Sequence, residues 1–157
     1  MPAETKKIIW LASYPKSGNT WLRAFLANYL MADAPDARPM ALEAMRQMSF
    51  SDASASAIGE IAGRDHRELS TRELFAARER YLERFASGPK PAFVKTHCAN
   101  ASVEGFEQIP LRFTRTAIYL VRDPRDVVLS YADHMGRTVE EAAAMMETQK
   151  RTGLRYM

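Results

Sequence analysis

One short segment constrains the fold of this chain more than any other. The apolar run of residues 8–12 leads directly into the polar sequence SYPKSGNTW of residues 13–21. A strand that breaks at a proline and at Gly18 and then opens a helix leaves several backbone N–H groups pointing into one loop. Lys16 adds a full positive charge there, and neighbouring Ser and Thr hydroxyls add further donors. The segment therefore predicts a strand-loop-helix unit that binds a phosphate or sulfate group.

The loop is close to the P-loop pattern G-x-x-x-x-G-K-[ST] but does not match it. Lys16 comes before Gly18, no glycine stands five residues upstream of the lysine, and the hydroxyl residue that would hold magnesium is displaced. This order of residues disfavours an ordinary ATPase or GTPase.

The composition is typical of one soluble globular domain spanning residues 1–157, with 46% hydrophobic and 26% charged residues. No apolar stretch approaches the roughly 20 residues of a membrane span, and the first apolar run predicts a strand rather than a signal peptide. A single cysteine, Cys98, excludes an internal disulfide and favours the reducing cytoplasm. The net charge of +3 suits an anionic ligand, but the basic residues form no dense cluster that would indicate nucleic acid.

The hydrophobic pattern alternates between short apolar runs and amphipathic segments. It predicts strands over residues 7–13, 91–97 and 117–121, and helices over residues 19–31, 70–87, 126–135 and 138–151. We expect residues 32–63 to form loops with one or two short helices. Continuous apolar strands alternating with helices indicate an α/β fold, with a parallel sheet covered on both faces.

Each predicted strand ends in a polar motif or leads into one, at residues 14–18, 95–97 and 122–125. Ligands of such sheets bind beyond the carboxyl ends of the strands, so we expect these motifs to converge on one edge. Taken alone, His97 is most simply a strand-end histidine bonded to backbone. Arg122 and Ser130 lie eight residues apart. Alternatively, Arg122 belongs to a network of Arg-Asp pairs, and Ser130 simply lies on a helix surface.

All three motifs resemble those of the sulfotransferases that use 3′-phosphoadenosine 5′-phosphosulfate. Residues 14–21 are similar to the 5′-phosphosulfate-binding loop of that family, residues 95–97 to its K-[TS]-H motif, and residues 122–131 to its 3′-phosphate motif. The resemblance covers about residues 7–21, 93–97 and 118–131. It implies a three-layer α/β/α fold with a central parallel sheet, similar to that of the P-loop NTPases.

The resemblance also implies site residues. His97 would take the proton from the acceptor, Lys16 would stabilise the leaving phosphate, and Lys95 would neutralise the transferred group; histidine suits the first role because its ordinary pKa lies near working pH. No metal is required. The residues implied to bind the nucleotide are Lys16, Ser17, Gly18, Asn19, Thr20, Trp21, Arg122 and Ser130.

The implied activity is transfer of the sulfuryl group to a hydroxyl or amine of a small acceptor, one with an apolar part. The family also has a later R-K-G type motif that closes over the 3′-phosphate and adenine, and this sequence lacks it. We therefore expect a short or C-terminally truncated relative, or one that a partner subunit completes. The alternatives are a nucleotide-binding module without turnover and a P-loop small-molecule kinase. The acceptor and the oligomeric state, including a homo-oligomer, stay open.

Several other residues receive a structural interpretation. Trp21 and Phe25 are expected in a core or interface, and His66 and His134 in solvated positions. The charged run of residues 78–80 is expected on an exposed helix face. Cys98 is expected to be a bystander rather than a reactive thiol.

Overall fold

In the part of the chain that the structure describes, a parallel sheet of four strands lies at the centre, in the order β2-β3-β1-β6. The computed structural model describes residues 6–31 and 48–152. The strands of the sheet are β1 (Ile8–Ser13), β2 (Ser49–Ser51), β3 (Ala92–Thr96) and β6 (Thr114–Leu120), and a separate antiparallel pair joins β4 (Ser102–Val103) to β5 (Phe106–Glu107). Three strands of the sheet were predicted, whereas β2 lies in a segment predicted as loops. Residues 32–47 of that segment lie outside the described residues.

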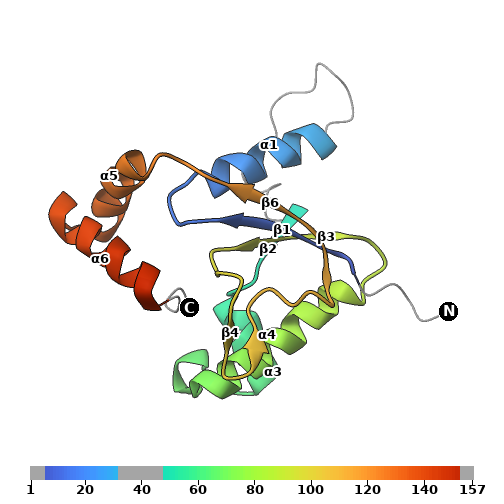
Figure 1. Cartoon of the computed structure of the whole chain (residues 1–157). Helices are drawn as coiled ribbons and strands as arrows, with labels where there is room; N and C mark the ends of the chain where they lie inside the picture. Colours follow the sequence, from blue (N-terminus) through green and yellow to red (C-terminus); the bar gives the residue numbers. More distant parts are fainter. Residues whose placement is uncertain (1–5, 32–47, 153–157) are drawn as a thin grey trace.

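Helices lie on both faces of the sheet, which confirms the predicted three-layer α/β/α architecture (Figure 1). The first helix, α1 (Asn19–Met31), covers one face, whereas α3 (Ala55–Ala62) and α4 (Thr71–Ala86) cover the other. A 3-10 turn, η1 (His66–Glu68), separates α3 from α4. The last two helices, α5 (Pro124–Met135) and α6 (Val139–Thr152), pack on each other beyond the carboxyl ends of the strands.

The core forms between the sheet and α4. Ile8 and Trp10 of β1 pack with Val94 of β3 and with Leu82 and Ala86 of the helix, all of them buried. Alternate residues of a strand point to the same face, so Ile8 and Trp10 meet α4 together. The core thereby fixes the strands whose carboxyl ends carry the polar motifs.

Local capping sets where the helices begin. The Ser70 hydroxyl accepts a hydrogen bond from the Glu73 N–H, and the Glu73 carboxylate accepts one from the Ser70 N–H, so the two residues form a capping box. Thr138 and Glu141 exchange the same two bonds before α6. The Asp123 side chain accepts from the N–H of Arg125 and caps α5, so this helix begins earlier than predicted.

Two apolar segments are more exposed than the sequence pattern predicted. Residues 115–119 of β6 are exposed, because this strand is at the edge of the sheet that the described residues form and the described helices cover its neighbours. On α1, Trp21 is 70% exposed and stacks on the exposed Phe25, so neither belongs to a core within the described residues. None of the helices in residues 6–31 and 48–152 is long and apolar enough to cross a membrane.

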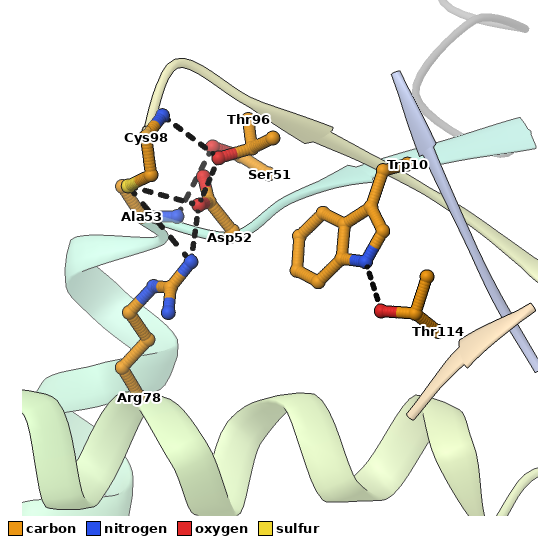
Figure 2. A network of polar contacts seen from close by, with 8 residues as sticks. All are labelled: Trp10, Ser51, Asp52, Ala53, Arg78, Thr96, Cys98 and Thr114. Atoms are coloured by element: carbon orange, nitrogen blue, oxygen red, sulfur yellow. Dashed lines mark hydrogen bonds and ion pairs between the residues drawn. The ribbon is translucent and has the colours of Figure 1, made fainter. Parts of the chain in front are cut away.

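The prediction of an exposed charged face on α4 is wrong for Arg78. Its side chain is only 1% exposed, and its Nη2 donates to Asp52 Oδ2 at 2.6 Å, beside Thr96 and Cys98 (Figure 2). Asp52 follows β2 directly and is also buried. The spacing along α4 could not reveal this ion pair, because the partner lies 26 residues away in sequence.

Arg78→Met is expected to lower the free energy of unfolding by about 3–5 kcal/mol, because it leaves the buried Asp52 carboxylate without its counter-charge. Arg80→Met is the matched control, since Arg80 is exposed on the same helix and its loss should cost less than about 0.5 kcal/mol. Urea denaturation measures both. Equal effects of the two variants would show that the ion pair contributes nothing specific.

Candidate functional site

The three polar motifs meet at one edge of the sheet. β1 lies between β3 and β6, with Leu11 opposite Lys95, Ala12 opposite Thr96, and Ser13 opposite Leu120. The strands are parallel, so the segments that follow them leave the sheet side by side. The loop after β1, His97 after β3 and Arg122 after β6 are therefore neighbours.

The loop after β1 is a tight turn built on two residues with positive φ. Lys16 has φ 66° and Gly18 has φ 102°, and the Ser17 N–H donates to the Tyr14 carbonyl at 3.2 Å. The bond from the Leu22 N–H to the Gly18 carbonyl, at 3.0 Å, opens α1. The preceding N–H groups have no partner in the helix ladder, which makes this end of α1 suited to an anion.

The side chains of the loop do not all turn toward one point. Asn19 is buried, and its Nδ2 donates to the Leu11 carbonyl at 2.8 Å and to the Ser13 hydroxyl at 3.2 Å. Ser17 is buried, whereas Thr20 and Trp21 are exposed. Asn19 thus ties the start of α1 to β1, and its role here is to hold the loop in shape.

His97 lies against the end of β1. Its Nδ1 is 2.7 Å from the Ser13 carbonyl oxygen. A carbonyl can only accept, so Nδ1 carries the hydrogen and Nε2 is left as the proton acceptor. Burial lowers the pKa of His97 below its ordinary value of 6.5; the Ser13 carbonyl and Asp52 oppose this shift, and Lys95 adds to it. This shift favours the uncharged imidazole near neutral pH.

Lys95 is the second-to-last residue of β3, is half-buried, and feels the charges of two other residues. Burial lowers its pKa below 10.5, Arg23 of α1 lowers it further, and Asp52 raises it. The Arg23 Nε donates to the Ser49 hydroxyl at 2.7 Å. This bond holds the second cation beside β2, the strand that pairs with β3. Lys95 thus adds positive charge one residue before Thr96 and two before His97.

Arg122 connects β6 to the loop. Its Nη1 donates to the Lys16 carbonyl at 3.3 Å, and its Nε lies 3.7 Å from an Asp126 carboxylate oxygen. The guanidinium is part-exposed, which leaves it accessible to an anion. Ser130 lies half-buried on α5, the helix that begins two residues after Arg122.

An open pocket of about 520 Å³ adjoins the loop and Arg122. Its walls come from the loop, β6, α5 and α6, and include Tyr14, Ser17, Tyr119, Arg122, Val128 and Met146. Most of this lining is apolar, and its charged residues are Arg122, Arg125 and Glu147. His97 is not among the lining residues, so the pocket adjoins the loop on its β6 side.

Sequence reasoning missed Asp52 and Arg78, which form a buried ion pair beside Thr96 and Cys98 (Figure 2). Asp52 follows a three-residue strand in a segment with no clear pattern, and nothing local marks it. Cys98 shares this environment: burial, followed by the nearby Asp52 carboxylate, raises the pKa of its thiol to about 11. That value fits the expected bystander role.

Comparison with known proteins identifies the family to which the chain belongs. The model of the family described as Sulfotransferase domain matches residues 6–152, almost the whole chain. A search of curated proteins gave no match. The matched range includes the loop after β1, His97 and Arg122. The chain therefore belongs to the sulfotransferase domain family.

Proposed function

We propose that this protein transfers the sulfuryl group of 3′-phosphoadenosine 5′-phosphosulfate to a hydroxyl or amine of a small acceptor. The observation that carries the proposal is the meeting of three groups at one sheet edge: the Lys16 loop, a His97 whose Nε2 has no partner among the described residues, and Arg122 bonded to that loop. Family membership supports the reaction type. The choice of sulfuryl donor rests on the anion-binding loop and on the arginine.

The loop would hold the 5′-phosphosulfate. The N–H groups before the first helical bond of α1, the Lys16 ammonium, and the hydroxyls of Ser17 and Thr20 are all suited to its oxygens. Gly18 and Asn19 would keep the loop in shape. Trp21, exposed on the first turn of α1, would lie against the nucleotide.

Arg122 and Ser130 would hold the 3′-phosphate. A guanidinium offers two parallel hydrogen bonds to a phosphate, which an ammonium does not. Arg122 would exchange its contact with Asp126 for this stronger charge-assisted pair. The two residues would thereby select a 3′-phosphorylated nucleotide.

In the transfer step, the acceptor oxygen or nitrogen attacks sulfur in line with the bond from sulfur to the bridging phosphate oxygen. That bond breaks, and its electron pair goes to the phosphate, where Lys16 stabilises the charge. The acceptor proton passes to His97 Nε2. Lys95 balances charge on the transferred group. The protein contributes positioning and preorganised charge.

Activity is expected to follow a bell-shaped pH profile. The base works only when deprotonated, and the lowered pKa of His97 keeps it so at lower pH, so the acid limb of kcat/KM should lie below pH 6.5. Lys95 must stay charged, and its lowered pKa places the alkaline limb below pH 10.5. An acid limb above pH 6.5 in steady-state assays would contradict this assignment.

Arg122→Ala is expected to weaken binding of 3′-phosphoadenosine 5′-phosphate by about 10–100-fold, through loss of a charge-assisted contact. Binding of adenosine 5′-phosphate, which has no 3′-phosphate, should change little. Arg115→Ala is the matched control, because Arg115 is exposed near the opposite end of β6. Titration calorimetry with both nucleotides measures the difference; equal losses for both would remove Arg122 from the 3′-phosphate site.

A transfer assay tests the proposed function as a whole. The protein is incubated with 3′-phosphoadenosine 5′-phosphosulfate carrying radioactive sulfur and a panel of phenols, aliphatic alcohols and amines. Label is expected in at least one acceptor with an apolar part. Binding of the nucleotide without transfer to any acceptor would instead support a binding module, and phosphate transfer from ATP with magnesium would support a kinase.

A further inference from the structure

A buried carboxylate lies directly behind the proposed base. Asp52 follows Ser51, the β2 residue opposite Lys95, and its backbone N–H donates to the Lys95 carbonyl at 3.1 Å. Its side chain is buried together with Arg78. Asp52 therefore adjoins the K-T-H segment through its backbone as well as its side chain.

The Asp52 carboxylate is hydrogen-bonded from two elements of the fold. Its Oδ2 accepts from Arg78 Nη2 of α4 at 2.6 Å and from Thr96 Oγ1 of β3 at 2.7 Å (Figure 2). The Cys98 thiol lies 3.6 Å from the same oxygen. Thr96 is completely buried, so water does not compete for these bonds.

The Thr96 hydroxyl links Asp52 to the backbone on the other side of His97. Its hydroxyl donates to Asp52 and at the same time accepts from the Cys98 N–H at 3.0 Å. A hydroxyl that binds the N–H two residues later forms a local turn and ends the strand. His97 is the central residue of this turn, so the turn sets the direction in which its imidazole leaves the backbone, toward the Ser13 carbonyl.

A contribution to the free energy of folding does not by itself explain why the chain has this buried network. The cost of desolvating two charges largely offsets their attraction, so a buried ion pair adds little over apolar residues of similar size. The charges that act on His97 also favour a functional role. Lys95 opposes protonation of the imidazole, whereas Asp52 favours it and so stabilises the imidazolium that forms when the base takes a proton. Arg78 offsets part of the Asp52 charge.

We propose that Asp52, held by Arg78 and acting through the Thr96 hydroxyl, is a positioning residue that keeps His97 Nε2 aimed at the acceptor. This inference rests on the proposed role of His97 as the base. Asp52 and Thr96 are not expected to contact the sulfuryl donor or the acceptor. Their contribution is to the orientation of the imidazole.

Thr96→Val removes the hydroxyl, nearly preserves the volume, and leaves the Asp52–Arg78 pair in place. It is expected to lower kcat by about 10–100-fold, as a small misplacement of a reacting group does, while the KM for the sulfuryl donor stays within about twofold. Thr96→Ser keeps the hydroxyl and is the matched control. It should retain kcat within about threefold of the unmodified protein, since the serine hydroxyl can make both bonds.

The tautomer of His97 gives a readout that needs no turnover. The chain has three histidines, and the imidazole nitrogen signals of His97 are assigned by their absence in His97→Asn, with His66 and His134 as internal references. Above the pKa of His97, the unmodified protein and Thr96→Ser should show the Nδ1–H tautomer alone. Thr96→Val should show a mixture of tautomers, with the other two histidines unchanged.

Two results would overturn the inference: a Thr96→Val protein with normal kcat and the pure Nδ1–H tautomer, or a Thr96→Ser protein as impaired as Thr96→Val. If Thr96→Val does not fold, the double variant Asp52→Leu, Arg78→Met removes both charges and the link together, and the same outcomes apply to it. If the unmodified protein transfers no sulfuryl group, the proposed function fails, while the tautomer comparison still decides whether the network positions His97.

Discussion

His97→Asn is expected to lower kcat for sulfuryl transfer by about 10²–10⁴-fold, the usual contribution of a positioned general base. An asparagine amide can still donate to the Ser13 carbonyl, but it cannot take a proton from the acceptor. Affinity for 3′-phosphoadenosine 5′-phosphate should stay within about twofold, because His97 follows β3 and does not belong to the loop after β1. Single-turnover kinetics and nucleotide titration together separate the two effects.

His134→Asn is the matched control for this variant. His134 is exposed in the last turn of α5 and has no part in the proposed chemistry. Its kcat should equal that of the unmodified protein. A His97→Asn protein that keeps full kcat, or that loses nucleotide affinity and turnover in the same proportion, would remove His97 from the role of base.

Lys16→Met is expected to lower both the affinity for the nucleotide and kcat. Loss of a preorganised charge at the leaving phosphate should lower kcat by about 10²–10³-fold. Nucleotide affinity should also fall, because the ammonium attracts the 5′-phosphate before the reaction begins. This joint loss distinguishes Lys16 from His97, whose removal should affect turnover alone. Titration calorimetry and single-turnover assays measure the two quantities.

Lys90→Met controls for a general loss of positive charge, since Lys90 is exposed in the turn before β3. It should change neither quantity. Unchanged nucleotide affinity in Lys16→Met would place the 5′-phosphate elsewhere, and the loop after β1 would then need another explanation.

Features with local causes could be predicted from the sequence. The turn after β1 follows from adjacent residues, with Gly18 at a φ that other residues rarely adopt. The start of α4 follows from Ser70 and Glu73, three residues apart. Parallel pairing of apolar strands then brings the ends of β1, β3 and β6 together.

Features that depend on distant partners could not be predicted. Asp52 meets Thr96 across 44 residues of sequence, and its strand β2 is too short to show a pattern. The spacing of Trp21 and Phe25 indicates that they share a face of α1, but it does not say what covers that face. Apolar residues on β6 indicate a strand, but not that it lies at the edge of the described sheet.

Thermal unfolding with two nucleotides tests the central claim most directly. A ligand that binds only the folded protein, at about one hundred times its Kd, adds about 2.7 kcal/mol, which raises Tm by about 5–10 °C in a chain of this size. We predict this rise with 3′-phosphoadenosine 5′-phosphate and little change with ATP and magnesium. Stabilisation by ATP and magnesium, with none by 3′-phosphoadenosine 5′-phosphate, would contradict the account.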